Sequence, residues 1–298
     1  MTVWLCSDPD HPRTTSASPA TDGETGGAAG SAPSEITELC AEHRQAVGHQ
    51  LARHLISTCT TPGERVVEAF TASDAVLRAA VELDRNAVAL VPHFPLAQHL
   101  GARLRARHRI EELTRVAMRS VRPDQMHLGL ADQARNVSLV VAAPPAYEVG
   151  GRGPKMVGQH GCPACRADLW MLGRQQLTGF LAGAWEILKP GGVLATVTTA
   201  RPQCDGRLHD PAPQVIARAS RQGFVYVQHV IALRVPIEGD ALAVQVHPGE
   251  VAQLHDIGSE APPPRVSVHA DVCLFVKPRH PDDGPGGQDD SGQGGGGR

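Results

Sequence analysis

A closely spaced cysteine pair is the most recognisable metal-binding pattern in the sequence. Cys162 and Cys165 are separated by two residues, and His160 lies just before them. Two thiolates at this spacing, around a tight turn, can both bind one Zn²⁺ ion. Cys204 and His209, in the loop after the next expected strand, are candidates for a fourth ligand. The pattern predicts a zinc site that stabilises a loop, with a redox-active pair or ordinary reduced cysteines as alternatives.

A pair of prolines marks a second place where chemistry could occur. The apolar run at 137–143 is followed by Pro144 and Pro145, and then by Tyr147. Proline cannot donate a hydrogen bond to a neighbouring strand, so a strand must end here. In an α/β sheet, the loop after the carboxyl end of a strand is where ligands bind. A stiff loop with an aromatic ring could hold a flat group there, although it is also an ordinary way to end a strand.

The elements that would position these residues alternate along the chain. Runs with apolar residues at helical spacing are separated by short apolar runs typical of strands. Strands joined through helices indicate crossover connections, and hence an α/β protein with a doubly wound, mostly parallel sheet. The last two long strands lack a convincing helix between them, so we expect them to pair antiparallel at one edge. The expected helices cover 34–59, 71–83, 96–120, 169–188 and 210–223, and the expected strands lie within 60–70, 86–91, 137–143, 193–199, 224–237 and 266–278.

Composition divides the chain into one domain and two tails. Residues 1–34 and 279–298 are rich in small and polar residues and have few periodic apolar positions. Such segments bury too little apolar surface to offset chain entropy, so we expect disordered tails. Residues 35–278 are long enough and apolar enough for one large α/β domain.

The overall charge and hydropathy narrow the classes of partner. The formal net charge of the 298 residues is −3, which is not the strongly positive charge typical of nucleic-acid-binding proteins. A local basic patch is the alternative route to nucleic-acid binding. No apolar run reaches the roughly 18–20 residues of a membrane span. No secretion signal is recognisable. We therefore expect a cytoplasmic protein without a membrane partner, with its seven cysteines reduced.

Three pieces in a fixed order resemble the class I S-adenosylmethionine-dependent methyltransferases. They are a strand, turn, helix and strand at 61–90, the strand with its proline pair at 137–148, and a helix, Lys-Pro-Gly-Gly turn and strand at 180–199. The Pro-Pro pair followed by an aromatic residue is most similar to the bacterial DNA amino-methyltransferases, of the N4-cytosine or N6-adenine type. The resemblance extends over residues 42–278 and implies a Rossmann-like methyltransferase fold.

The resemblance also implies roles for individual residues, with S-adenosylmethionine as cofactor and DNA as partner. The residues expected around the cofactor are Glu68, Phe70, Ser73 and Asp124. The residues expected to frame a base extruded from DNA are Pro144, Pro145 and Tyr147.

The same comparison shows where this chain departs from the family. Ala72 and Asp74 replace the glycines of the first motif, and Asp74 would face the carboxylate of the cofactor. Val91 replaces the acid that accepts hydrogen bonds from the ribose hydroxyls. Ala143 precedes the prolines, where the family has Asp, Asn or Ser, and Tyr147 is one place late.

Two functions follow from these observations. The first is an S-adenosylmethionine-dependent methyltransferase-like protein, by resemblance a DNA amino-methyltransferase, with full, weak or lost activity left open. The second is a catalytically inactive binding or scaffold protein with the same fold, with zinc as a candidate stabilising ion. Hydride transfer, NTP hydrolysis, zinc proteolysis and serine hydrolysis lack their motifs. The arginine-rich run at 103–109 is expected to be a solvated helix face, with phosphate contact as the alternative, and His229 and His247, without a nearby acid in sequence, are expected to be structural.

Overall fold

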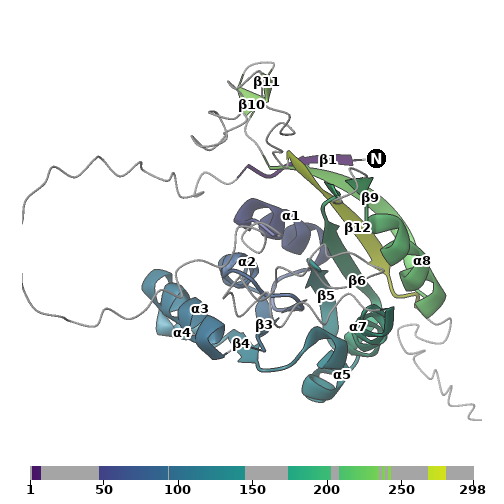
Figure 1. The fold of residues 1–298 in the computed structure, drawn as a ribbon. Coiled ribbons are helices and arrows are strands. Elements are labelled where there is room, and N and C mark those ends of the chain that lie inside the picture. The colour runs from purple at the N-terminus through teal and green to yellow at the C-terminus, as the bar shows by residue number, and fades with distance from the viewer. Residues whose placement is uncertain are drawn as a thin grey trace, which may run out of the picture.

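An eight-stranded sheet lies at the centre of the molecule (Figure 1). The computed structural model describes residues 2–7, 47–92, 94–144, 174–202, 208–234, 237–238, 241–242 and 268–279. The strand order is β1-β9-β12-β6-β5-β2-β3-β4. The strands are β1 (Thr2–Leu5), β2 (Arg65–Glu68), β3 (Asn86–Leu90), β4 (Val116–Arg119), β5 (Val137–Ala142), β6 (Leu188–Thr198), β9 (Val225–Leu233) and β12 (His269–Val276).

Helices cover both faces of this sheet (Figure 1). One layer contains α1 (His49–Cys59), α2 (Ala75–Glu82) and α3 (Phe94–Arg107), and the other contains α5 (Met126–Gly129), α7 (Arg174–Ile187) and α8 (Ala212–Gln222). A strand covered on both sides is largely apolar, and all six residues of β5 are buried, with Ser138 as its one polar residue. The remaining short elements are α4 (Ile110–Leu113), the 3₁₀ turns η1 (Pro123–Gln125) and η2 (Ala131–Gln133), and the two hairpins β7 (Arg201–Pro202) with β8 (Leu208–His209) and β10 (Ile237–Glu238) with β11 (Ala241–Leu242).

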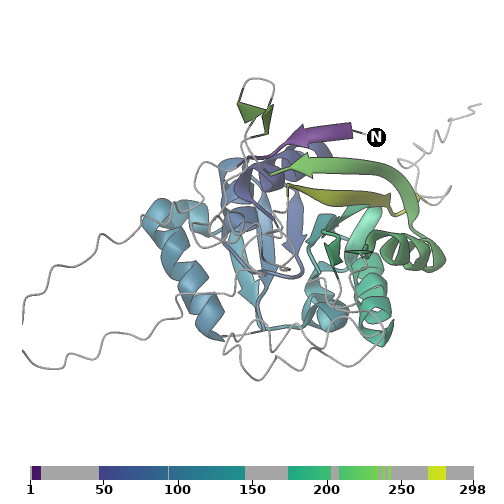
Figure 2. The same cartoon turned by 45° about the horizontal axis from the view of Figure 1, so that its top comes forward.

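The strand directions confirm the predicted fold class, a doubly wound, mostly parallel and Rossmann-like α/β sheet. The ladders β6-β5, β5-β2, β2-β3 and β3-β4 are all parallel. β12 runs antiparallel to both β6 and β9, so the last two long strands pair as predicted. β12 lies inside the sheet, however, because β9 and then β1 follow it; Figure 2 shows β1, β9 and β12 side by side.

Two predicted boundaries were wrong. Thr2–Leu5, expected in a disordered tail, forms β1 and pairs with Val230–Leu233 of β9. Val116–Arg119, expected at the end of a long helix, forms β4. Both strands lie at the edges of the sheet, and their residues alternate between half-buried and exposed positions, so neither carries a buried apolar run. Each is specified by backbone pairing with a neighbouring strand. The rest of the predicted domain division stays a prediction.

The Lys-Pro-Gly-Gly turn begins β6 and brings it against β5. Gly191 has a φ of +80°, a conformation that side chains with a β-carbon rarely adopt. A β-carbon on Gly192 would lie 2.8 Å from the carbonyl oxygen of Lys189 and 3.0 Å from that of Val137. The register of β5 against β6 shifts at this point, between Val137 and Leu139. Glycine is therefore required by conformation at one position and by close approach at the other.

Candidate functional site

The strand ends singled out in the sequence meet at one edge of the sheet. Glu68, at the end of β2, is in register with Val141 of β5, and the two strands are parallel neighbours. The backbone N–H of Ala69 continues this ladder by donating to the carbonyl of Val141, at 2.9 Å. Loops that follow parallel strands emerge on the same side. The turn after β2 and the proline loop after β5 therefore begin next to each other. The prediction of one ligand site shared by these two segments depends on this arrangement.

Glu68 is a buried acid with unused hydrogen-bonding capacity. Its side chain is only 4% exposed, and among the described residues its Oε2 atom has no hydrogen-bond partner. Burial raises the pKa of Glu68 to about 8, with a further upward contribution from the charge of Asp74 and an opposing one from a hydrogen bond with Thr71. A carboxyl group held neutral at a strand end can accept a cationic ligand group and then ionise.

Asp74, just before α2, is also buried but is compensated by two arginines. Its carboxylate is 3% exposed. Arg103 Nη2 lies 3.1 Å from Oδ1, and Arg107 Nη1 lies 3.5 Å from Oδ2. The two arginines are one turn apart on α3, so both reach the same acid. One carboxylate with two guanidinium groups leaves a formal local charge of about +1 at neutral pH.

This cluster revises the interpretation of the arginine-rich run. Arg103 and Arg107 are 45% and 41% exposed, so they are solvated in part, as expected. Their guanidinium groups nevertheless neutralise a buried acid 29 residues or more away in sequence, which is a specific structural role. The repulsion that Asp74 was expected to exert on a negatively charged ligand is therefore offset.

Phe70 and Ser73 have structural contacts of their own. The Phe70 ring packs edge-on against Phe180 of α7, with the ring centroids 5.2 Å apart. The Ser73 hydroxyl accepts a hydrogen bond from the backbone N–H of Ala75 at 3.3 Å, at the start of α2. Phe70 thus anchors the turn to the core, and Ser73 helps to start the helix.

The end of β3 carries a buried aliphatic side chain. Val91 is 1% exposed and belongs to the core cluster of the α1, α2 and α3 layer. Its N–H donates to the carbonyl of Arg119 at 2.8 Å, which continues the pairing of β3 with β4. Val91 therefore provides packing and no acceptor for ligand hydroxyl groups.

Asp124 lies in the first turn of η1 and is held by its own neighbour. Arg122 donates from Nε to Oδ1 at 3.1 Å and from Nη2 to Oδ2 at 2.9 Å. The Asp124 backbone packs closely on α7, because a β-carbon on Gly179 would lie 3.2 Å from its carbonyl oxygen. The bidentate pair fixes the orientation of the carboxylate.

The remaining predicted site residues are only partly within the described structure. Pro144 follows the buried Ala143 and is half-buried. Among the described residues, no group of three or more His, Cys, Asp or Glu side chains is arranged to hold a metal ion. The zinc site stays a prediction, because its ligands are outside those residues. The predicted positions outside the described residues are Pro145, Tyr147, His160, Cys162, Cys165, Cys204 and the side chain of His209.

One acid–histidine contact was missed from the sequence. His229 Nε2 lies 2.8 Å from Oδ1 of Asp271, and His269 Nε2 lies 3.8 Å from Oδ2 of the same carboxylate. The partners come from β9 and β12, which are neighbours only because the chain pairs them. His229 was expected to be structural for lack of an acid nearby in sequence, and the antiparallel pairing supplies one.

The described helices include none that is both long enough and apolar enough to cross a membrane.

Comparison with known proteins gives similarity in structure but not in sequence. No family model matches the chain, and no curated protein matches it. Among solved structures, the 1,6-didemethyltoxoflavin-N1-methyltransferase of Burkholderia thailandensis is 13% identical, with 80% of this chain and 79% of that chain covered and a TM-score of 0.41. N-methyltransferase NodS of Bradyrhizobium japonicum is 10% identical, covering 78% and 94%, with a TM-score of 0.46. A methyltransferase-like protein of Bacillus halodurans is 14% identical, covering 76% and 99%, with a TM-score of 0.47. Similarity at this level concerns the general fold alone.

Proposed function

We propose that this chain binds S-adenosylmethionine at the carboxyl ends of β2, β3 and β5, as a methyltransferase-like protein. The observation that carries the proposal is the buried carboxyl of Glu68, whose Oε2 has no hydrogen-bond partner among the described residues. A buried polar atom left without a partner costs free energy unless a ligand or water satisfies it. A ligand that brings a cation to this strand end would satisfy it.

The charges at the end of β2 fit the amino-acid part of that cofactor, which carries an ammonium and a carboxylate. Glu68 would accept hydrogen bonds from the ammonium. Arg103 and Arg107 would attract the carboxylate, since together they outweigh the charge of Asp74. Both expectations follow from charge complementarity, and they remove the objection that the replacement of a motif glycine by Asp74 had raised.

The end of β3 does not fit the ribose part. Val91 offers no acceptor for the two ribose hydroxyls. Loss of a charged acceptor costs about 1.5–3 kcal/mol, which is roughly a 10- to 150-fold weaker dissociation constant. We therefore expect binding in which the amino-acid part contributes more than the ribose.

The bound cofactor would supply an electrophilic methyl group, and the residues of this chain would supply position. The proline loop after β5 would hold the acceptor next to the cofactor, since Glu68 and Val141 are in register. The sequence resemblance suggests an exocyclic amine of a DNA base as acceptor. Ala143 cannot accept a hydrogen from such an amine, so we expect slow methyl transfer. Transfer would rest on positioning more than on activation of the acceptor.

A catalytically inactive binding protein is the second candidate. Val91 and Ala143 favour it, since each places an aliphatic side chain where the family has a polar one. Under this alternative, cofactor binding and catalysis are separate properties, and the first can exist without the second.

Methyl transfer and cofactor binding are therefore tested separately. The assay follows transfer of a tritiated methyl group from S-adenosylmethionine to duplex DNA, single-stranded DNA and RNA, while a thermal shift with S-adenosylhomocysteine reports binding. We expect a thermal shift and slow transfer to at least one nucleic acid. A thermal shift without transfer would select the inactive candidate, and the absence of both would refute the proposal.

A further inference from the structure

A second polar cluster lies at the carboxyl end of β6, on strands that the cofactor proposal does not use. Thr198 is the last residue of β6, and it is directly opposite Asp271 of β12 in the antiparallel ladder. Side chains at directly opposite positions share one face of a sheet, with β-carbons about 4.5–5.5 Å apart. His229 of β9 contacts the same carboxylate, with Nε2 2.8 Å from Oδ1. β6 and β5 lie between β12 and β2, so this cluster is separate from Glu68.

The hydroxyl of Thr198 is a buried polar group with unused hydrogen-bonding capacity. The residue is 2% exposed, and among the described residues its Oγ1 atom has no hydrogen-bond partner. A buried hydroxyl in this state costs free energy unless a ligand or water satisfies it. The Asp271 side chain opposite is 15% exposed, so solvent reaches its carboxylate. A ligand bound to that carboxylate would come within reach of the Thr198 hydroxyl, which can accept a hydrogen bond.

A second carboxylate, that of Asp210, lies near the same strand. Asp210 is exposed, and its Oδ1 accepts a hydrogen bond from the backbone N–H of Ala212 at 2.9 Å, at the start of α8. Burial raises the pKa of the Cys273 thiol to about 11, and the charges of Asp271 and Asp210 contribute in the same direction. Both carboxylates are therefore close enough to act on one group of β12.

Among the described residues, neither acid has an ion pair with a lysine or an arginine. Asp271 is contacted by the imidazoles of His229 and His269, and Asp210 by the start of its own helix. Asp74, in contrast, is compensated by two guanidinium groups. Two carboxylates beside neutral imidazoles leave a net negative charge at the cluster.

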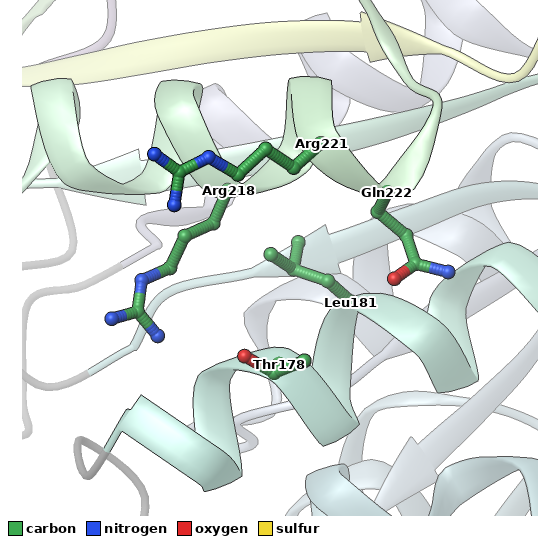
Figure 3. Close-up of a pocket in the computed structure, with 5 residues that line it drawn as sticks. All are labelled: Thr178, Leu181, Arg218, Arg221 and Gln222. Carbon is green, nitrogen blue, oxygen red and sulfur yellow. The ribbon is translucent and has the colours of Figure 1, made fainter.

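The arginines of α8 do not compensate this charge. Arg218 and Arg221 line the groove between α7 and α8, together with Thr178, Leu181 and Gln222 (Figure 3). That groove contains none of the residues of the cluster on β6, β9 and β12. The charge at the end of β6 is therefore available to a cation from outside the described structure.

We propose that the cluster of Thr198, Asp210, Asp271 and His229 binds the ammonium group of a small organic molecule. An ammonium group brings a positive charge and three N–H donors, and carboxylate and hydroxyl oxygens accept such donors. The hydrogen bond with His229 fixes the orientation of the Asp271 carboxylate. The proposal is independent of cofactor binding, because none of these residues lies on β2 or α3.

The test is calorimetric titration of the full chain at pH 8 and low ionic strength with butylamine, butanol and butyltrimethylammonium. Butylamine is then an ammonium ion with three N–H donors, butanol is neutral, and butyltrimethylammonium is a cation without N–H donors. We expect butylamine to bind with a dissociation constant below about 5 mM and butanol not to bind. Butyltrimethylammonium should bind at least about fivefold more weakly than butylamine, because it cannot donate hydrogen bonds.

Two variants locate the binding site. Asp271→Asn should weaken binding of butylamine by at least about tenfold, because it removes a charged acceptor. Thr198→Val replaces the hydroxyl by a methyl group of similar volume and should weaken binding by about threefold. Asp132→Asn is the matched control, at an exposed aspartate paired with Arg119, and should leave binding unchanged.

Each other outcome decides against the proposal. Equal binding of butylamine and butyltrimethylammonium would show attraction of charge without hydrogen bonding, and no binding of butylamine would refute the site. Equal weakening by Asp132→Asn would show a nonspecific charge effect. If Asp271→Asn does not fold, Thr198→Val decides alone, and unchanged affinity in that folded variant would overturn the proposal.

Discussion

The ends of β2 and β3 are adjacent in the sheet, yet they have opposite characters. Glu68 of β2 is in register with Ala89 of β3, so the positions that follow lie side by side. The end of β2 carries two buried acids, Glu68 and Asp74, with two arginines from α3. The end of β3 carries the buried, aliphatic Val91. Under the proposed function, the amino-acid part of the cofactor would meet charged groups at the end of β2, and the ribose would meet an aliphatic side chain at the end of β3.

The largest expected effect concerns the protonation of Glu68. Its pKa in the folded protein, about 8, lies above the ordinary value of 4.5, so folding favours the protonated form. The free energy of unfolding should therefore fall as pH rises from about 4.5 to about 8. Glu68→Gln removes this dependence and should be more stable than the wild type at pH 8.5, by about 2–5 kcal/mol.

Denaturant unfolding at pH 5 and pH 8.5 measures this effect. Glu111→Gln, at an exposed glutamate of α4, is the matched control and should retain the wild-type pH dependence. The same slope in the wild type and in Glu68→Gln would show that Glu68 ionises normally, and the contrast between the two strand ends would then lose its main support.

The next effect concerns the compensation of Asp74. Replacing Arg103 and Arg107 together by alanine leaves a buried carboxylate without a cation, which should cost about 2–4 kcal/mol of unfolding free energy. Arg105→Ala on the same helix should cost less than about 0.5 kcal/mol. Chemical denaturation at pH 7 provides both values. If the Arg103→Ala, Arg107→Ala variant is as stable as Arg105→Ala, the ion pairs with Asp74 do not contribute to the free energy of unfolding.

The difference in charge between the ends of β2 and β3 can also be reduced by introducing an acid at the end of β3. Val91→Asp should increase affinity for S-adenosylhomocysteine by about tenfold, because ribose hydroxyls gain a charged acceptor. It should also lower the stability of the ligand-free protein by about 2–3 kcal/mol, because the position is buried. Val91→Leu controls for side-chain volume. An affinity gain in both variants, or in neither, would refute a ribose site here.

The smallest effect is expected at Asp124. Asp124→Asn keeps the shape of the side chain but loses the ion pair with Arg122, which is partly exposed. The cost in stability should be below about 1 kcal/mol. Titration with S-adenosylhomocysteine should show a change of less than about fivefold. A complete loss of binding would instead place Asp124 at the centre of the site.

Sequence patterns predicted the interior of this fold better than its edges. β5 was recognisable because its six consecutive residues are all buried and all but Ser138 are apolar. β1 and β4 were missed because their residues alternate between half-buried and exposed positions, and their places are decided by pairing with β9 and β3. A local pattern can therefore identify a strand covered on both faces, whereas an edge strand depends on its partner.

The candidate site shows the same division. Glu68 and Phe70 were identified from a local motif, and their place beside β5 followed from the order of the strands. The pairing of Asp74 with Arg103 and Arg107 was not predicted, because no local sequence pattern links the start of one helix to arginines on another helix. The raised pKa of Glu68 was equally invisible, because it depends on burial by distant residues.

The most direct test of the contrast is the proton balance of cofactor binding at pH 7. Titration with S-adenosylhomocysteine in buffers of different ionisation enthalpy measures the protons released per ligand. If the ligand ammonium binds Glu68, the carboxyl must ionise, so the wild type should release close to one proton and Glu68→Gln none. Binding without proton release in the wild type, or no binding at all, would contradict the assignment of this strand end to the amino-acid part of the cofactor.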